Sequence, residues 1–323
     1  MKLHNFDSNA LPLRAGLVLA GARCTLATNS PEILSCVSHW IPKTSNVSGS
    51  FIDLEIFADA STSRALPVKA HFRGLKHLVF AAFGTQEIFT FDLLRKRVIG
   101  VVSLATASDT AFWNERLLPI LVGVMGITVG VIPLHSACLD RDGKALLIAG
   151  HSGAGKSTLS VALAQRGYSL VSDDWIYVSK DAQSVDLIAS GMSVPVKLLP
   201  DAVQHFPELQ VLTPKESLNG ELAFEVDATD VFSSQVKQTS RPHWLMFLER
   251  DNRAGCDFFP CSAEDAEAFY ERSAELLPEE LHEAAWKRTE IIKLVASREC
   301  YRVRSGESPQ KTAEAIERFC ESA

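Results

Sequence analysis

The sequence predicts a mixed α/β protein in which a strand-rich unit precedes a unit built on a βαβ pattern. From residue 13 to residue 102, short apolar runs alternate with turn residues, a pattern that favours strands. Near residues 105–110 the apolar residues change to helical spacing. Within residues 144–178 a strand, a glycine-rich loop, a helix and a second strand follow one another. These observations predict two domains, a strand-rich accessory domain (1–107) and an α/β domain (108–323).

The composition is that of an ordinary globular protein. The chain has 323 residues, of which 46% are hydrophobic and 22% are charged, so it can bury a substantial core. Its formal net charge of −7 gives no basic footprint for a nucleic-acid backbone, so we expect no nucleic-acid partner. Seven cysteines without a CxxC pair favour reduced thiols over a disulfide framework or a zinc site. With no clear signal sequence, we expect a cytoplasmic protein.

The stretch "LLPILVGVMGITVGVIPL", Leu117 to Leu134, is uncharged and about as long as a membrane span of ~18–20 residues. Pro119 and Pro133 interrupt it, three glycines weaken it, and no positive flank follows. We therefore expect a buried helix followed by a core strand, and no membrane partner.

The stretch "IAGHSGAGKST", which ends at Thr158, contains the pattern G-x-x-x-x-G-K-[ST], in which backbone N–H groups wrap the phosphates of a nucleotide. Because it lies between a predicted strand and a predicted helix, backbone donors and the helix N-terminus can converge on an anion. We expect Lys156 to reach the β- and γ-phosphates and the Ser157 hydroxyl to ligate Mg²⁺. The alternative is a glycine-rich turn that binds nothing. The predicted nucleotide-binding residues are Gly150, His151, Ser152, Gly153, Ala154, Gly155, Lys156, Ser157 and Thr158.

Two carboxylates and a histidine are predicted near the same phosphates. Asp173 and Asp174 follow the second apolar run, where a parallel strand beside the first would end near the loop. One of them could hold Mg²⁺ while the other accepts a proton from an attacking hydroxyl, as phosphoryl transfer needs. A capping or turn pair with metal contact only is the alternative. His135 lies on the predicted strand that precedes the strand leading into the loop. Because the loop and the two carboxylates are expected nearby, we expect His135 to have a role near the γ-phosphate rather than a purely structural one.

His135, the loop "GHSGAGKS" and the following "ALAQRGYSLVSDD" resemble, in order and spacing, the C-terminal catalytic domain of the HPr kinase/phosphorylases and related serine kinases. The resemblance covers residues 133–178 well and the rest weakly. That family shares a P-loop fold with phosphoenolpyruvate carboxykinase, so the resemblance implies this kinase fold for residues 108–323. It implies ATP and Mg²⁺ as cofactors and a homo-oligomer. The accessory domain looks like that of HPr-kinase-related proteins.

The resemblance also implies roles for single residues. Asp174 matches the family's proton acceptor and Asp173 its acidic neighbour, which we expect to bind metal with Ser157. Lys156 matches the phosphate-binding lysine and His135 the active-site histidine. Arg241, before a predicted strand, is matched to a later catalytic arginine, with a solvated surface arginine as the alternative. The family's "EVRG" signature has no clear counterpart in "LIASGMSVPVKLLPDAV", so a second metal ligand and phosphorylase activity are not predicted.

Together these features predict an ATP-dependent phosphotransferase, a serine kinase similar to HPr kinase, that moves the γ-phosphoryl group to a hydroxyl. The expected acceptor is a serine of a small protein or peptide. A small-molecule hydroxyl kinase and a nucleotide-dependent switch without an acceptor remain open, because the motif specifies the donor alone. No guanine-reading N-K-x-D motif occurs, which favours ATP over GTP.

Overall fold

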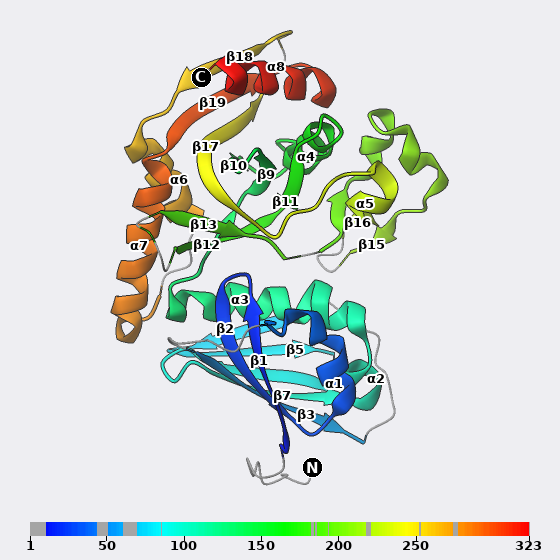
Figure 1. Ribbon diagram of the computed structural model, residues 1–323, viewed down its shortest axis with the longest axis vertical. Helices are drawn as coiled ribbons and strands as arrows, with labels where there is room; N and C mark the ends of the chain where they lie inside the picture. The colour runs from blue at the N-terminus through cyan, green and yellow to red at the C-terminus, as the bar shows by residue number, and fades with distance from the viewer. Residues whose placement is uncertain are drawn as a thin grey trace. The chain divides into compact units, whose positions relative to one another are not determined.

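The structure is a computed structural model. It divides into two compact units, Met1–Val131 with Leu276–Trp286, and Ile132–Glu275 with Lys287–Ala323. Both combine strands and helices, which confirms the predicted mixed α/β class (Figure 1). The residues that the structure describes are 11–43, 51–60, 70–84, 86–181, 184, 186–192, 194–217, 221–251, 253–273 and 277–322.

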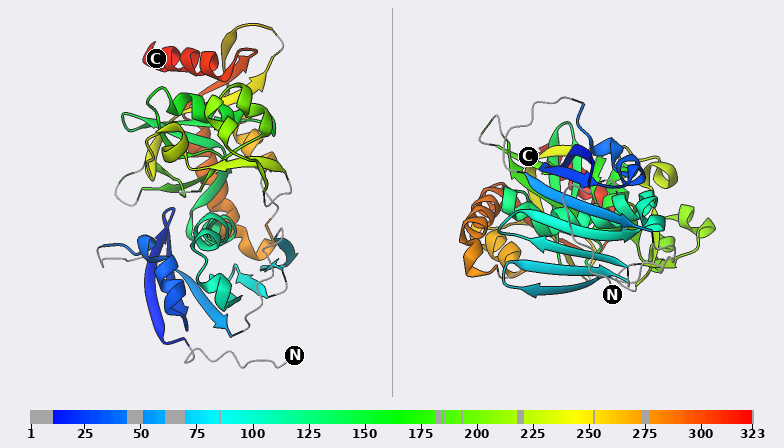
Figure 2. Two further views of the ribbon diagram at one scale, coloured as in Figure 1. Left: turned by 90° about the vertical axis from the view of Figure 1, so that its right-hand side faces the viewer. Right: turned by 90° about the horizontal axis from the view of Figure 1, so that it is seen from below.

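The first unit is built on a seven-stranded sheet, seen from two further sides in Figure 2. The alternating burial of β6, in which Phe89 and Phe91 are fully buried, is the period-2 pattern of a sheet with one face covered. Short helical segments α1 (Pro31–Cys36), η2 (Ser38–Trp40) and α2 (Leu104–Ala107) accompany the sheet. The strand order is β1 (Leu13–Leu19), β2 (Ala22–Thr28), β3 (Ile52–Asp59), β7 (Arg97–Ser103), β6 (Glu87–Asp92), β5 (Leu78–Phe83) and β4 (His71–Leu75).

The apolar stretch forms a helix and then a strand, as predicted. A π-helical turn η3 (Phe112–Leu117) continues into α3 (Leu118–Met125) and the 3₁₀ turn η4 (Gly126–Val129), and the strand β8 (Ile132–His135) follows. Among the described residues, Phe112–Val129 is the one helical segment long and apolar enough to cross a membrane, and 56% of that segment is buried inside the structure.

The start of this helix is tied to the first unit. The Trp113 indole N–H donates to the carbonyl of Thr106 at 3.0 Å, and the Phe112 ring meets the Phe83 ring edge-on at 5.3 Å. The first compact unit accordingly extends to Val131. The structural division thus differs from the predicted one between residues 107 and 108, which falls before a helix whose aromatic residues pack into the earlier core.

The second unit contains a nine-stranded sheet in which β10, β17 and β19 run parallel. Its main strand order is β11 (Ser169–Ser172), β9 (Ala137–Arg141), β10 (Lys144–Ala149), β17 (Thr239–Arg250), β13 (Leu187–Ser190), β12 (Trp175–Lys180) and β8, with β19 (Glu299–Ser305) beside β17 and β18 (Cys256–Pro260) beside β19. A smaller sheet joins β14 (Val196–Leu198), β16 (Leu222–Val226) and β15 (Lys215–Glu216). The helical segments are α4 (Lys156–Ala164), η5 (Pro200–Gln204), η6 (Pro207–Val211), α5 (Ala228–Phe232), α6 (Ala263–Ser273), η7 (Glu279–Leu281), α7 (His282–Ala296) and α8 (Pro309–Ser322), of which η7 and the start of α7 belong to the first unit.

The predicted strand–loop–helix–strand order is present, with one difference in the sheet. β11 does not lie beside β10, because β9 pairs antiparallel with both strands and separates them. Two antiparallel steps leave β11 running in the same direction as β10. The two strands therefore still end at the same edge of the sheet, which is where the loop begins.

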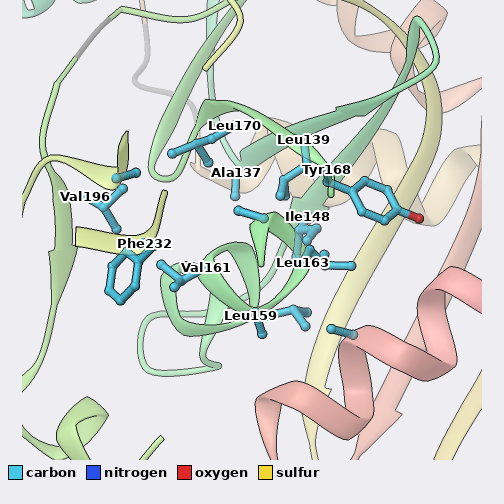
Figure 3. Packing of buried hydrophobic residues seen from close by; sticks show 14 of the residues in the cluster. Ala137, Leu139, Ile148, Leu159, Val161, Leu163, Tyr168, Leu170, Val196 and Phe232 are labelled. Carbon is cyan, nitrogen blue, oxygen red and sulfur yellow. The ribbon is translucent and has the colours of Figure 1, made fainter. Parts of the chain in front are cut away.

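Helix α4 holds the loop against the sheet through a buried apolar core. Leu159 and Leu163 of α4 pack with Ile148 of β10 and Leu139 of β9, and all four are at most 2% exposed (Figure 3). Residues 145–149 of β10 are buried without alternation, as expected for a strand covered on both faces. Burial of this kind contributes about 1.5–3 kcal/mol for each large apolar side chain, so both ends of the loop are firmly anchored.

Candidate phosphate-binding and transfer site

The nine predicted nucleotide-binding residues, 150–158, lie between the end of β10 and the first turn of α4. Gly155 caps the helix with a φ of +95°, and Gly153 has a φ of +79°. Both values lie in the left-handed region that glycine adopts without a Cβ penalty. The loop can therefore turn tightly and present backbone N–H groups, together with the N-terminus of a nine-residue helix, to an anion.

The side chain of Lys156 reaches from the start of α4 back across the loop to Gly150. The side-chain ammonium donates to the carbonyl of Gly150 at 3.0 Å, and the residue is 8% exposed. Burial lowers the pKa of this ammonium, and the negative charge of Asp174 partly offsets the effect. The cation is thus held inside the loop, where it can neutralise phosphate charge.

Asp173 and Ser157, the two predicted metal ligands, lie together. Asp173 is 3% exposed, its carboxylate accepts a hydrogen bond from the backbone N–H of Lys197 at 3.2 Å, and the Ser157 side chain lies close enough to act on its pKa in the lowering direction. Burial, followed by the neighbouring charge of Asp174, raises the pKa of Asp173 to about 7. A buried carboxylate with a raised pKa gains strongly from a cation beside it.

The pair of Ser157 and Asp173 fits Mg²⁺ carried by a nucleotide. Among the described residues, no group of three or more His, Cys, Asp or Glu side chains gathers as a metal site. Nucleotide-bound Mg²⁺ takes one or two protein oxygens and fills its octahedron with phosphate oxygens and water. One hydroxyl and one carboxylate at the loop match that donor set.

His135 and Asp174 form the open side of the site. The His135 Nε2 lies 2.9 Å from a carboxylate oxygen of Asp174, whose side chain is 56% exposed. Antiparallel pairing of β8 with β12 sets His135 directly opposite Trp175. The two rings stack at 5.1 Å with an interplanar angle of 22°. The stack and the contact orient an accessible carboxylate beside the phosphate loop.

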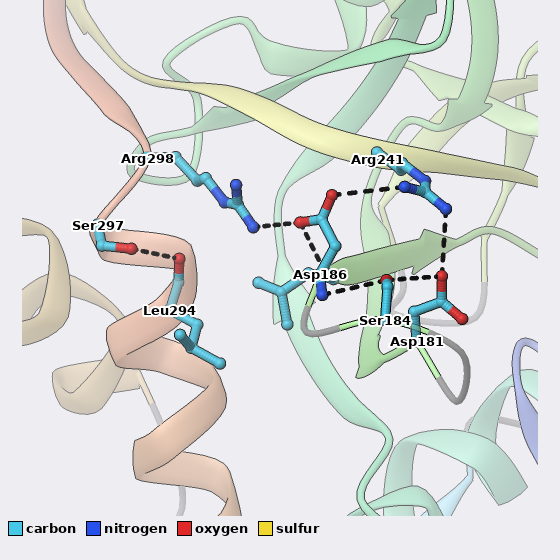
Figure 4. A network of polar contacts seen from close by, with 8 residues as sticks. Asp181, Ser184, Asp186, Arg241, Leu294, Ser297 and Arg298 are labelled. Atoms are coloured by element: carbon cyan, nitrogen blue, oxygen red, sulfur yellow. Dashed lines mark hydrogen bonds and ion pairs between the residues drawn. The ribbon is translucent and has the colours of Figure 1, made fainter.

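The structure does not bring Arg241 to this site. In the parallel pairing of β10 with β17, Arg241 lies opposite Lys144, at the start of β10, whereas the loop follows its end. The six residues of β10 therefore put Arg241 about 20 Å from the loop. Arg241 instead faces the carboxylates of Asp181, at 3.1 Å, and Asp186, at 3.7 Å (Figure 4). Its position gives no support to the predicted catalytic role.

The Asp186 carboxylate also accepts a hydrogen bond from the Arg298 guanidinium. The cluster of Asp181, Asp186, Arg241 and Arg298 therefore connects the starts of β13, β17 and β19 (Figure 4). The backbone N–H of Leu187 and then Arg298 lower the pKa of the Asp186 carboxyl. The charges of this cluster are matched within it, which is the usual condition of a structural ion-pair network.

Sequence reasoning missed two aromatic residues at the site. Trp175 directly follows Asp174 and is 46% exposed, and a tryptophan next to an acidic pair is a signal that the sequence offers. Phe269 of α6 meets the ring of His151 in the loop at a centroid distance of 5.9 Å. No local pattern could have indicated Phe269, because it comes from a helix far along the chain.

Comparisons with known proteins find sequence matches to the part of the chain that contains the loop. Residues 130–199 match the family model of the HPr Serine kinase C-terminal domain. The HPr kinase/phosphorylases of Bacillus mycoides (strain KBAB4) and Bacillus cytotoxicus are 32% and 31% identical to the chain over 120 residues. Each match covers 37% of this chain and 35% of the relative, so the chain spans about a third of the length of these relatives.

Among solved structures, the HPr(Ser) kinase/phosphatase from Coxiella burnetii aligns with a TM-score of 0.33 and 18% identity, over 59% of this chain and 97% of that one. The sequence matches, rather than this alignment, confirm the resemblance seen around the loop.

Proposed function

We propose that this HPr kinase-related chain is an ATP-dependent phosphotransferase that moves the γ-phosphoryl group to a hydroxyl. The observation that carries the proposal is the exposed Asp174 carboxylate, which lies 2.9 Å from His135 Nε2 and close enough to the buried Lys156 ammonium to affect its pKa. An accessible, oriented carboxylate beside the loop can accept the proton of an acceptor hydroxyl, a step that a switch without an acceptor does not include.

In the proposed reaction Asp174 accepts the proton of the acceptor hydroxyl. The freed oxygen attacks the γ-phosphorus while the bond between that phosphorus and the β,γ-bridging oxygen breaks, and ADP leaves. His135 keeps the carboxylate in place, and Lys156 with the loop amides stabilises the charge on the phosphates. Mg²⁺, held by Ser157 and Asp173, would neutralise phosphate charge.

The expected acceptor is a serine on a small protein. The curated relatives are named for action on HPr, so HPr is the first acceptor to test. We propose a cytoplasmic enzyme that works as a homo-oligomer, as the resemblance implies. A small-molecule hydroxyl acceptor and a switch without an acceptor are the alternatives.

The test is transfer of label from γ-labelled ATP, with Mg²⁺, into purified HPr and into the proteins and small molecules of a bacterial extract. Asp174→Asn should lower transfer by about 100-fold or more, because general-base catalysis contributes that much, and should leave ATP affinity within about twofold. Asp201→Asn removes an exposed carboxylate from the same unit, in η5, and should change neither quantity.

Transfer that survives in Asp174→Asn would contradict the role of this carboxylate. Label confined to small molecules would favour a metabolite kinase. ATP hydrolysis or tight ATP binding with no labelled acceptor in either fraction would favour the switch.

A further inference from the structure

Two rings at the edge of the phosphate loop have no part in the proposed phosphoryl transfer. His151 is the second residue of the loop and its side chain is exposed. The ring of the half-buried Phe269 meets the His151 ring at 5.9 Å with an interplanar angle of 61°. Aromatic groups that stay accessible beside a polar site are typical of ligand contacts, because their burial against a ligand is favourable.

The Phe269 ring is fixed relative to the loop. It packs against Phe247 of β17 at 4.7 Å and against Tyr270 at 5.6 Å, both of which are buried. Phe247 lies opposite Ala149, the residue directly before the loop, in the pairing of β10 with β17. The Tyr270 hydroxyl shares a 2.8 Å hydrogen bond with Ser136, next to His135. The surface is therefore built into the sheet that carries the loop.

We propose that His151 and Phe269 form the stacking surface for the base of the bound nucleotide. The inference rests on the proposed function, because the loop must first hold the triphosphate. The loop amides and Lys156 can bind phosphates but offer no flat apolar surface for a base. Of the rings in this cluster, Phe247 and Tyr270 are buried, at 7% and 2% exposure, which leaves His151 and Phe269 to meet a ligand.

Stacking also defines the class of ligand. Every nucleobase has a π-face, so a surface of two rings favours a purine without selecting adenine over guanine. The expected preference for ATP over GTP therefore rests on the missing guanine-reading motif and not on this surface.

The test separates the base from the phosphates by titrating the protein calorimetrically, with Mg²⁺, against ATP and against inorganic tripolyphosphate. His151→Ala and Phe269→Leu should each weaken ATP binding by about tenfold and leave tripolyphosphate binding within about twofold, because only ATP carries a base. His151→Phe, which keeps a ring at that position, should retain most of the ATP affinity. His71→Ala, which removes an exposed imidazole of the first unit, is the matched control.

Three results would overturn the proposal while leaving phosphoryl transfer intact. The variants could weaken ATP and tripolyphosphate equally, they could leave ATP binding unchanged, or the wild-type protein could bind tripolyphosphate as tightly as ATP. A wild-type protein that bound neither compound would refute the proposed function itself, and the base site with it.

Discussion

At the scale of the single residue, Asp173 combines deep burial with a raised pKa, and this makes folding sensitive to pH. Its carboxyl has a pKa of about 7 in the folded protein, against an ordinary value of 3.8. Between about pH 4 and pH 7 the folded state therefore binds this proton more tightly than the unfolded state does. The free energy of unfolding should fall as the pH rises through that window, by at most about 1.4 kcal/mol per pH unit, and should level off above it.

The measurement is denaturant unfolding in EDTA at several pH values, for the wild type and for Asp173→Asn. Because the amide does not titrate, the variant should show a flatter profile, and the difference between the two profiles isolates the contribution of Asp173 from those of the other ionisable groups. Parallel profiles would mean that the carboxyl ionises normally in its buried position.

How far single residues could be predicted depended on the distance between them along the chain. Lys156 and Ser157 follow from a local motif that dictates its own backbone geometry. The sequence predicted that Asp174 and His135 lie near the same phosphates. Their direct contact could not be predicted, because it depends on the long-range pairing of β8 with β12. Phe269 could not be found, since only the packing of α6 brings it to the loop.

At the scale of the element, Gly150 connects β10 to the loop and leaves no space for a side chain. Its φ is +155°, and an added Cβ would lie 2.8 Å from the carbonyl oxygen of Leu248 in β17. Gly150→Ala must therefore push β10 and β17 apart or rotate the loop. We expect a loss of about 1–3 kcal/mol in the free energy of unfolding, and ATP affinity lower by about tenfold or more.

Gly167→Ala is the matched control for this change. Gly167 follows α4 with a φ of +92°, but a Cβ there would meet nothing within 4 Å. Its substitution should cost stability through backbone strain and leave ATP affinity unchanged. Calorimetric titration and chemical denaturation of both variants make the comparison, and equal losses of ATP affinity would show that the contact with Leu248 does not matter for the loop.

The order of helices and strands along the chain was easier to predict than which strands pair with one another in the sheet. The βαβ order came from apolar periodicity, which depends on each segment's own burial. The insertion of β9 between β10 and β11 depends on hydrogen bonds between strands, and periodicity carries no information about partners. Arg241 illustrates the same limit, because the sequence indicated its strand but not that it starts at the edge away from the loop.

At the scale of the whole molecule, each compact unit has its own buried core. The first contains Phe83, fully buried, which meets Phe89 at 5.8 Å and Phe112 at 5.3 Å, and the second contains the cluster around α4 that anchors the loop. The predicted division between residues 107 and 108 was based on the change in the spacing of apolar residues from a strand pattern to a helical pattern. The structural division instead follows core packing, which assigns the helix after that point to the first unit.

Separate cores lead us to expect two thermal transitions, of which the nucleotide stabilises one. A ligand that binds only the folded second unit raises its stability by about 2.7 kcal/mol at a hundredfold excess over Kd, and leaves the first unit unchanged. Phe83→Ala should lower the free energy of unfolding of the first unit and leave the second unit unchanged, since the loss of a fully buried phenylalanine side chain costs about 3–5 kcal/mol. Scanning calorimetry of the wild type and the variant, with and without MgATP, tests both statements. A single transition that both MgATP and Phe83→Ala shift would show that the two cores unfold as one cooperative body, and the proposed catalytic unit would then depend on the strand-rich unit for its stability.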